Sequence, residues 1–163
     1  MGKTITFSSL PSSAEEMRAI ADLSSPFNTA ALAIAALANY EANPEKTIEM
    51  LNVLKGPEPL SPFQQQFIRE RLSGKMHVVR SYFNGTSPQN NYQPSVPYSI
   101  EVNENPYSYQ NEGYATLWLT SSGADNPRPI SLRKKPSTGE WFLWGDITYL
   151  SDIGIPVEQD PWA

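Results

Sequence analysis

Hydrophobic residues recur at helical spacing through the first half of the chain and at strand spacing through the second half. In the first half, each apolar segment follows serine, threonine, asparagine or proline, residues that are typical of helix starts. Ser13 and Glu16 form a capping-box pattern, and Gly56 is typical of a helix end. The sequence therefore predicts four helices, over residues 13–22, 30–42, 44–55 and 62–72.

The second predicted helix is apolar on nearly all sides. Six alanines between residues 30 and 38 surround Leu32, Ile34 and Leu37. A helix without a polar face is buried between other elements, and alanine lets neighbouring backbones approach closely. We therefore expect residues 30–42 to form the central packing helix of the fold.

From residue 76 the apolar period changes to two, which is typical of strands. Residues 113–121 alternate most clearly, with Leu117 and Leu119 on one face and Trp118 on the other. The polar turn at residues 136–139 joins two further alternating runs, which predicts a β-hairpin. The predicted strands cover residues 76–83, 98–103, 113–121, 130–134 and 140–146, and residues 86–97 are expected to form a long loop.

Helices followed by antiparallel strands are typical of an α+β domain. We expect about four N-terminal helices packed on a C-terminal curved antiparallel sheet of four to five strands. The length of 163 residues favours a single domain over residues 1–163. Its expected parts are a helical half at 12–73, a strand half at 76–155 and a polar tail at 156–163. This element order resembles that of the nuclear-transport-factor-2-like proteins, in which helices precede a bent sheet and a pocket lies between them.

Composition and charge exclude several classes of function. The net charge of −5 argues against nucleic acid as a partner, because phosphate neutralisation needs clustered lysine and arginine. The dense basic run at residues 133–135 lies near a hairpin tip, where solvated charge is the usual interpretation. The absence of cysteine removes disulfides and thiolate metal sites. No apolar run has the length of a signal-peptide core or a membrane span, so we expect a cytoplasmic protein that does not interact with membranes.

Two residues are candidates for acid–base catalysis. His77 is the only histidine of the chain, and histidine titrates near working pH. Without a second histidine or a cysteine, we expect neither a metal site nor a cofactor. Asp146 follows a tryptophan and a glycine, so a carboxylate stands beside aromatic surface as a possible partner for the histidine. The structural alternatives are a buried or exposed histidine and an aspartate that hydrogen-bonds the next turn.

The aromatic residues of the strand half are candidates for binding. Tyrosine and tryptophan are enriched at interfaces and in ligand pockets, and also in ordinary sheet cores. Trp118 lies on the face opposite Leu117 and Leu119, so it requires cover from a ligand, a loop or another subunit. The candidate residues for binding a ligand or partner are Trp118, Trp144, Tyr82 and Tyr149.

The C-terminal segment carries a family resemblance. It reads WFLW at residues 141–144, LSDIGIP at residues 150–156 and DPWA at residues 160–163. This segment resembles a family of small, single-domain, uncharacterised proteins from Gram-positive gut bacteria. The resemblance implies a bacterial protein and identifies no catalytic residues.

Three functions follow from these features. The first is a non-enzymatic binding or protein-interaction module for a protein partner or a small polar ligand. The second is a small enzyme with a pocket between helices and sheet, in which His77 and Asp146 are the acid and base. The third is a self-associating structural subunit, for example a homodimer that covers the tryptophan-bearing face of the sheet.

Overall fold

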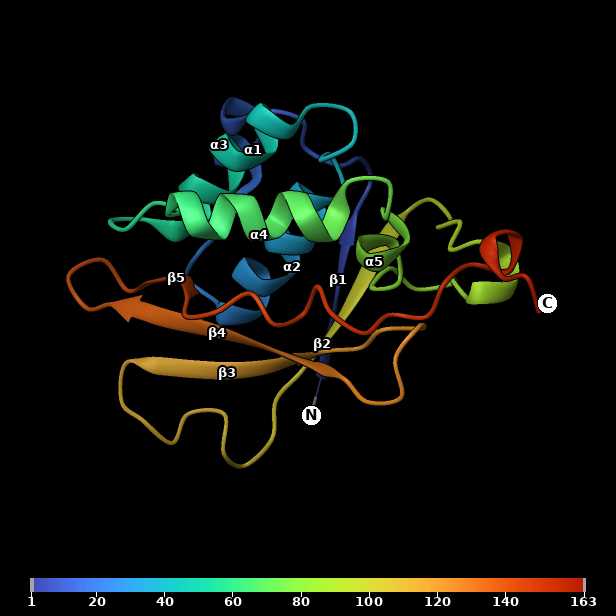
Figure 1. The fold of residues 1–163 in the computed structure, drawn as a ribbon. Helices are drawn as coiled ribbons and strands as arrows, with labels where there is room; N and C mark the ends of the chain where they lie inside the picture. Colours follow the sequence, from blue (N-terminus) through green and yellow to red (C-terminus); the bar gives the residue numbers. More distant parts are fainter. Residues whose placement is uncertain (1, 163) are drawn as a thin grey trace.

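The computed structural model describes residues 2–162, in which five helices pack against one curled, five-stranded antiparallel sheet (Figure 1). The helices are α1 (Ala14–Ile20), α2 (Pro26–Leu37), α3 (Pro44–Lys55), α4 (Pro62–Leu72) and α5 (His77–Arg80). The strands are β1 (Gly2–Phe7), β2 (Tyr98–Asn103), β3 (Tyr114–Leu119), β4 (Arg128–Lys135) and β5 (Glu140–Trp144). Two short 3₁₀ turns, η1 (Pro88–Asn90) and η2 (Val157–Gln159), complete the regular structure.

The predicted arrangement of four helices followed by four to five strands is wrong at two places. β1 precedes the helices and forms one edge of the sheet, because it pairs with β2 nearly a hundred residues later. The predicted strand at residues 76–83 instead contains α5, which brings the number of helices to five. Residues 76–79 are all buried in succession. In one helical turn, the side chains of such a run point in several directions and can all contact neighbouring elements. In a strand, every second side chain would point away from the core.

The sheet bends between β2 and β3, where the pairing between neighbouring strands is shortest (Figure 1). These strands pair at Val102–Leu119 and Asn103–Trp118 alone, and the remainder of β2 is bridged by Phe83 at Ile100. The other neighbouring strands pair over five or six positions. The strand order β1-β2-β3-β4-β5 is therefore a continuous antiparallel series that bends between its second and third members.

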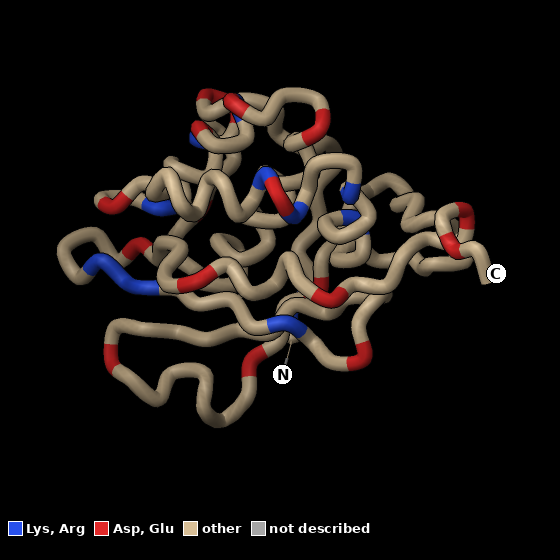
Figure 2. Tube along the Cα trace, in the orientation of Figure 1, with Lys and Arg blue, Asp and Glu red and all other residues tan. Residues whose placement is uncertain are grey.

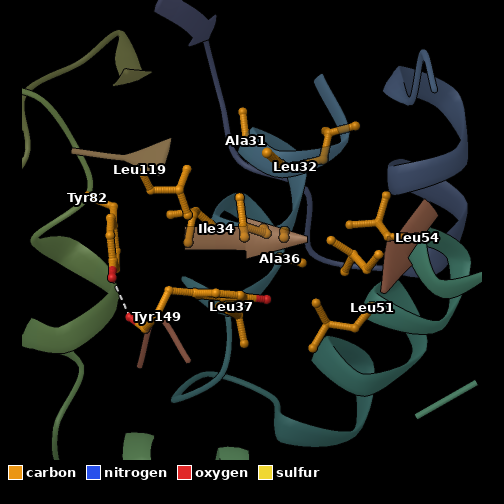
Figure 3. Close-up of a cluster of buried hydrophobic side chains, with 14 of the residues drawn as sticks. Ala31, Leu32, Ile34, Ala36, Leu37, Leu51, Leu54, Tyr82, Leu119 and Tyr149 are labelled. Atoms are coloured by element: carbon orange, nitrogen blue, oxygen red, sulfur yellow. Dashed lines mark hydrogen bonds between the residues drawn. The ribbon is translucent and has the colours of Figure 1, made fainter. Parts of the chain in front are cut away.

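α2 lies inside this curl and is buried almost completely. Eleven of its twelve residues are buried, and the helix contacts α3 and all five strands. Figure 3 shows Ile34 and Leu37 of α2 among Leu51 and Leu54 of α3 and Leu119 of β3. The helix begins at Pro26, which is earlier than predicted. The fixed φ of proline is already helical, so Pro26 starts the helix and does not interrupt it.

Two tyrosines hold the segment after β5 in place by hydrogen bonds to its backbone. The Tyr82 hydroxyl donates a hydrogen bond to the carbonyl oxygen of Tyr149 (Figure 3). The Tyr92 hydroxyl donates to the carbonyl oxygen of Gly154 over 2.6 Å. A Cβ at Gly123 would lie 2.4 Å from the Tyr92 hydroxyl, so glycine is required for this close approach. Tyr92 thus fixes both the long 86–97 loop and the C-terminal segment.

His77 occupies the first position of α5 and is buried, with 7% of its surface exposed. Its ring lies 5.8 Å from that of Tyr92, measured between ring centroids. Its Nδ1 is buried and has no hydrogen-bond partner among the described residues. Burial lowers the pKa of His77, and the charges of Lys75 and Arg80 lower it further.

We predict that enlarging a side chain of α2 destabilises the protein strongly. Ala33 is 0% exposed, so Ala33→Leu must displace close-packed neighbours. The expected loss in free energy of unfolding is about 1–3 kcal/mol. The matched control is Ala19→Leu on the exposed side of α1, with an expected change within about 0.5 kcal/mol. Urea unfolding followed by circular dichroism measures both. Equal effects of the two substitutions would contradict the central packing role of α2.

We also predict that His77 makes the fold sensitive to mild acid. Because its folded-state pKa lies below the unfolded value of 6.5, the unfolded state takes up the proton first as the pH falls. The free energy of unfolding should therefore decrease as the pH falls below the unfolded pKa and level off below the folded pKa. His77→Gln should lose less stability than the wild type between neutral pH and pH about 5. Denaturant unfolding at several pH values tests this, and parallel pH profiles would refute it.

Candidate functional site

The two tyrosines among the candidate binding residues belong to the core. Tyr82 and Tyr149 are 1% and 4% exposed, and they are joined by the hydrogen bond described above. Burial raises the pKa of both phenols. Their apolar rings pack in the core cluster with α2 and β3, as Figure 3 shows. They support the segment after β5, and Tyr149 also lines a small cavity between this segment, α3 and α4.

The two acid–base candidates lie in different surroundings. His77 belongs to α5 and is buried beside Tyr92, whereas Asp146 is exposed two residues after the end of β5. Asp146 lines a groove with Phe63, Phe67 and other residues, and His77 does not line that groove. Asp146 also lines a small cavity beneath α4, and His77 is not among the residues that line it.

The two tryptophans share the outer face of the sheet, which is the face turned away from α2. Leu117 and Leu119 are fully buried on the inner face, and Trp118 between them is half-buried on the outer face. The register places Trp118 opposite Pro129 and Trp144 opposite Ser131. Pro129 and Ser131 are two residues apart on β4 and face the same side of the sheet. The two indoles therefore lie on either side of β4, on the same face of the sheet.

Arg133 is the centre of an aromatic cluster on this outer face. It pairs directly with Tyr114 across β3 and β4, and Trp144 is its diagonal neighbour on β5. The guanidinium carbon lies 4.5 Å from the Trp144 ring centroid and 5.5 Å from that of Tyr114. The two rings are 6.0 Å apart and tilted by 58°. Arg133 is thus held over two aromatic rings by cation–π attraction.

The edges of the Arg133 guanidinium have no partner among the residues that the structure describes. Among residues 2–162, its N–H groups form no hydrogen bond, and the ion pair present there joins Arg80 to Glu41. Lys134, whose ammonium lies 5.9 Å from the Trp141 ring centroid, and Lys135 also form no ion pair in this part of the chain. The hairpin therefore presents three cations that form no ion pair with the described residues.

A cleft of about 280 Å³ opens where this hairpin meets the connection between α3 and α4. We call it the hairpin cleft. Figure 2 shows the basic run of the hairpin at the left of the view, below the connection between α3 and α4. Its lining residues are Lys55, Pro57, Glu58, Arg133, Lys134, Lys135, Pro136, Phe142, Leu143 and Trp144.

Lys55 is the buried cation of the hairpin cleft. It is the last residue of α3 and is 8% exposed. Burial lowers its pKa, because the apolar surroundings disfavour the charged ammonium, and the carboxylate of Glu58 opposes this effect. Lys55 forms no ion pair among the described residues. A buried ammonium without such a partner favours an anion nearby.

Gly56 brings the two walls of the hairpin cleft together. This residue ends α3 with a φ of +66°, a conformation that glycine adopts without strain. A Cβ on Gly56 would lie 2.7 Å from an atom of the Phe142 ring. The phenyl ring of β5 therefore packs directly on the backbone beside Lys55, and a substitution of Gly56 would push the hairpin away.

The charge of the hairpin cleft is opposite to that of the protein. The whole chain carries a net charge of −5, whereas four cations and one carboxylate line the cleft. Phe142 and Trp144 add aromatic surface. This combination suits an anionic group attached to an apolar or aromatic body. In residues 2–162 no group of three or more histidine, cysteine, aspartate or glutamate side chains could hold a metal ion.

The sequence indicates part of this site and misses the rest. The hairpin turn sets Lys135 opposite Glu140, and this register makes Arg133 and Trp144 diagonal neighbours on one face. The basic run was expected to be a solvated tip, although the hairpin register already predicts its contact with tryptophan. Lys55 could not be assigned from the sequence, because only tertiary packing brings the end of α3 to β5.

Comparison with known proteins identifies the family. The chain matches no curated protein and no solved structure. No helix among residues 2–162 is both long enough and apolar enough to cross a bilayer. A family model matches residues 9–157, which confirms the resemblance to an uncharacterised family, while the origin in Gram-positive gut bacteria stays a prediction. Because the match spans most of its length, the chain belongs to the family described as Domain of unknown function (DUF6935).

Proposed function

We propose that this protein is a non-enzymatic binding module whose hairpin cleft holds an anionic group carried on an aromatic or apolar body. The observation that carries the proposal is the state of Arg133. Two aromatic rings fix its guanidinium at 4.5 and 5.5 Å, and its N–H groups bind nothing among the described residues. Trp144, one of the residues expected from the sequence to bind a partner, supplies the nearer ring.

A fixed guanidinium is a better anion receptor than a mobile one. Its planar N–H fork matches the two oxygens of a carboxylate or the oxygens of a phosphate. An arginine on a free surface loses side-chain entropy when it is ordered by a ligand. Stacking on Trp144 and Tyr114 orders Arg133 in advance, so more of the interaction energy appears as affinity.

Lys55 adds a second and different contribution. Lys55 is buried and lines the cleft together with Phe142, where the effective dielectric constant is lower than in water. An anion in the cleft would favour the charged form of Lys55 and raise its lowered pKa. Anion binding and protonation of Lys55 are then linked, so binding should weaken at alkaline pH.

The outer face and the hairpin cleft together suggest how a partner is oriented. The anion would lie between Arg133 and Lys55, and its apolar body would contact Phe142 and Trp144. Glu58 at the rim repels a ligand whose negative charge extends beyond the cleft. The hairpin cleft therefore favours one compact anionic group next to an aromatic or aliphatic one, as in an acidic peptide segment or a small aromatic acid.

We predict that phenyl phosphate binds in the hairpin cleft and that the neutral analogue benzyl alcohol does not. In a titration followed by ¹H–¹⁵N NMR, the largest shifts should fall on residues 55–58 and on the hairpin around Arg133 and Trp144. A hydrogen bond to a charged group contributes roughly 1.5–3 kcal/mol, so Arg133→Gln should weaken binding by about tenfold or more. Lys55→Met should weaken the binding of phenyl phosphate, and the affinity of this variant should no longer decrease as the pH becomes alkaline.

The matched control is Arg18→Gln, because Arg18 is an exposed arginine of α1 that does not line the hairpin cleft. It should leave the phenyl phosphate affinity unchanged. Added salt should weaken the binding of phenyl phosphate, since the attraction is electrostatic. Equal binding of benzyl alcohol, or shifts that map away from the cleft in the wild type, would overturn the proposal.

A further inference from the structure

The first strand of the sheet has a free edge. β1 pairs with β2 along its whole length, from Gly2 opposite Asn103 to Phe7 opposite Tyr98. Outside this ladder, no backbone group of residues 2–7 forms a hydrogen bond with any other residue of the described chain. A free edge of this length is a template for a further strand.

The hydrogen bonds of β2 show which groups of β1 point outward. The carbonyl oxygen of Ser99 accepts from the Asn84 N–H over 2.9 Å, and that of Glu101 accepts from the Thr120 N–H over 3.3 Å. Ser99 and Glu101 therefore direct their backbone groups away from β1. In an antiparallel ladder, the residues opposite them, Thr6 and Thr4, then direct theirs away from β2. The N–H and C=O groups of Thr4 and Thr6 form the free edge.

The opposite edge of the sheet is closed by the protein itself. The Trp141 N–H of β5 donates to the carbonyl oxygen of Leu23 over 2.7 Å. The carbonyl oxygen of Trp141 accepts from the Thr29 hydroxyl over 2.8 Å. Leu23, between α1 and α2, and Thr29, in the first turn of α2, thus cover β5 at Trp141. Nothing in the described chain covers β1 in this way.

A groove of about 340 Å³ runs beside the free edge. Its apolar lining comes from Ile5 and Phe7 of β1, Ile20 of α1 and Leu32 of α2. Ile20 is 48% exposed although it is a large aliphatic residue. Ile5 and Phe7 lie on the inner face, and both are partly buried against the core. A strand added to β1 would place its own alternate side chains beside this groove.

We propose that β1 pairs with β1 of a second copy of this chain, antiparallel about a twofold axis at Ile5, to form one continuous sheet. In this register Thr4 stands opposite the partner's Thr6, and each pair of threonines exchanges its outward N–H and C=O groups. Ile5 stands opposite the partner's Ile5 as a non-hydrogen-bonded pair, whose side chains approach closely. Two β-branched residues and two threonine pairs are favourable cross-strand neighbours.

Charge also permits this self-pairing. Lys3 is the one charged residue of β1, and the register places it opposite the partner's Phe7, so like charges do not meet. Within one chain Lys3 already lies 4.9 Å from the Phe27 ring centroid, which shows that the ammonium tolerates aromatic surface there. The interface is isologous and closed, so it ends at the dimer and does not produce filaments.

One strand pair and the adjoining groove form a small interface. Stable complexes bury about 1,200–2,000 Å² in total, and weaker, reversible ones bury less. We therefore expect a dimer that forms and dissociates with concentration. Sedimentation velocity from micromolar to near-millimolar concentrations should show a monomer–dimer equilibrium, and the amides of Thr4 and Thr6 should gain protection from hydrogen exchange as the concentration rises.

Thr6→Pro tests the register directly. It removes the outward N–H of residue 6 on both copies, which breaks two hydrogen bonds of the interface, and proline is tolerated at edge positions whose N–H faces solvent. We expect the dimer dissociation constant to rise by at least about tenfold. Thr6→Val is the matched control, because it keeps the N–H and the β-branched shape, and it should still dimerise. Thermal unfolding of both variants establishes that they are folded.

A second variant acts on the twofold axis. Ile5→Lys would place two ammonium groups opposite each other and should abolish the dimer, with hydrogen exchange of the β2 amides as the measure that β1 remains paired. A wild type that stays monomeric at all concentrations would overturn the proposal. So would a dimer that Thr6→Pro leaves intact, or one that Trp144→Ala dissociates, since that result would place the contact on the outer face.

Discussion

The burial of α2 is the constraint on which the rest of the structure depends. An α-helix with no polar face can be stable in water only if other elements cover it on all sides. Five strands do so by curling, and α3 closes the remaining side. The alanines of α2 let this cover approach closely, so the sheet can wrap tightly enough to contact the helix with every strand. Each strand must therefore direct its aliphatic side chains to the inner face.

The inward direction of these side chains explains which residues occupy the outer face and the hairpin cleft. With Leu117, Leu132 and Leu143 turned inward, the alternate positions of the same strands turn outward and remain free for other chemistry. There the chain carries tryptophan, tyrosine and arginine in register. The β4–β5 hairpin meets the end of α3 because both elements pack on α2, which brings the buried Lys55 to the outward Phe142. The hairpin cleft is thus a consequence of covering α2.

Local features of the sequence predicted much of this fold. α3 and α4 have the bounds that their proline starts and glycine or serine ends indicate, and the hairpin turn lies where the polar segment predicts it. The failures are β1 and α5, whose conformations depend on distant partners. β1 is a strand because β2 accepts it, and the valines of α5 favour a strand locally but are buried together by tertiary packing. The position of Lys55 in the hairpin cleft also depends on residues that are distant in the sequence, so it could not be predicted. The contact of Arg133 with Trp144, in contrast, follows from the hairpin register.

The order of the strands keeps the two proposed surfaces apart. β1 is the first strand of the sheet and the hairpin contains the last two, so the free edge and the hairpin cleft lie at opposite ends of the series. Pairing through β1 would extend the sheet away from the hairpin cleft of each copy. Both hairpin clefts of the dimer would therefore stay open to solvent. Association and anion binding should therefore be thermodynamically independent for a small ligand. For a partner that carries two suitable anionic groups, however, a dimer offers two receptors at a fixed separation, and its avidity depends on whether the partner can span them.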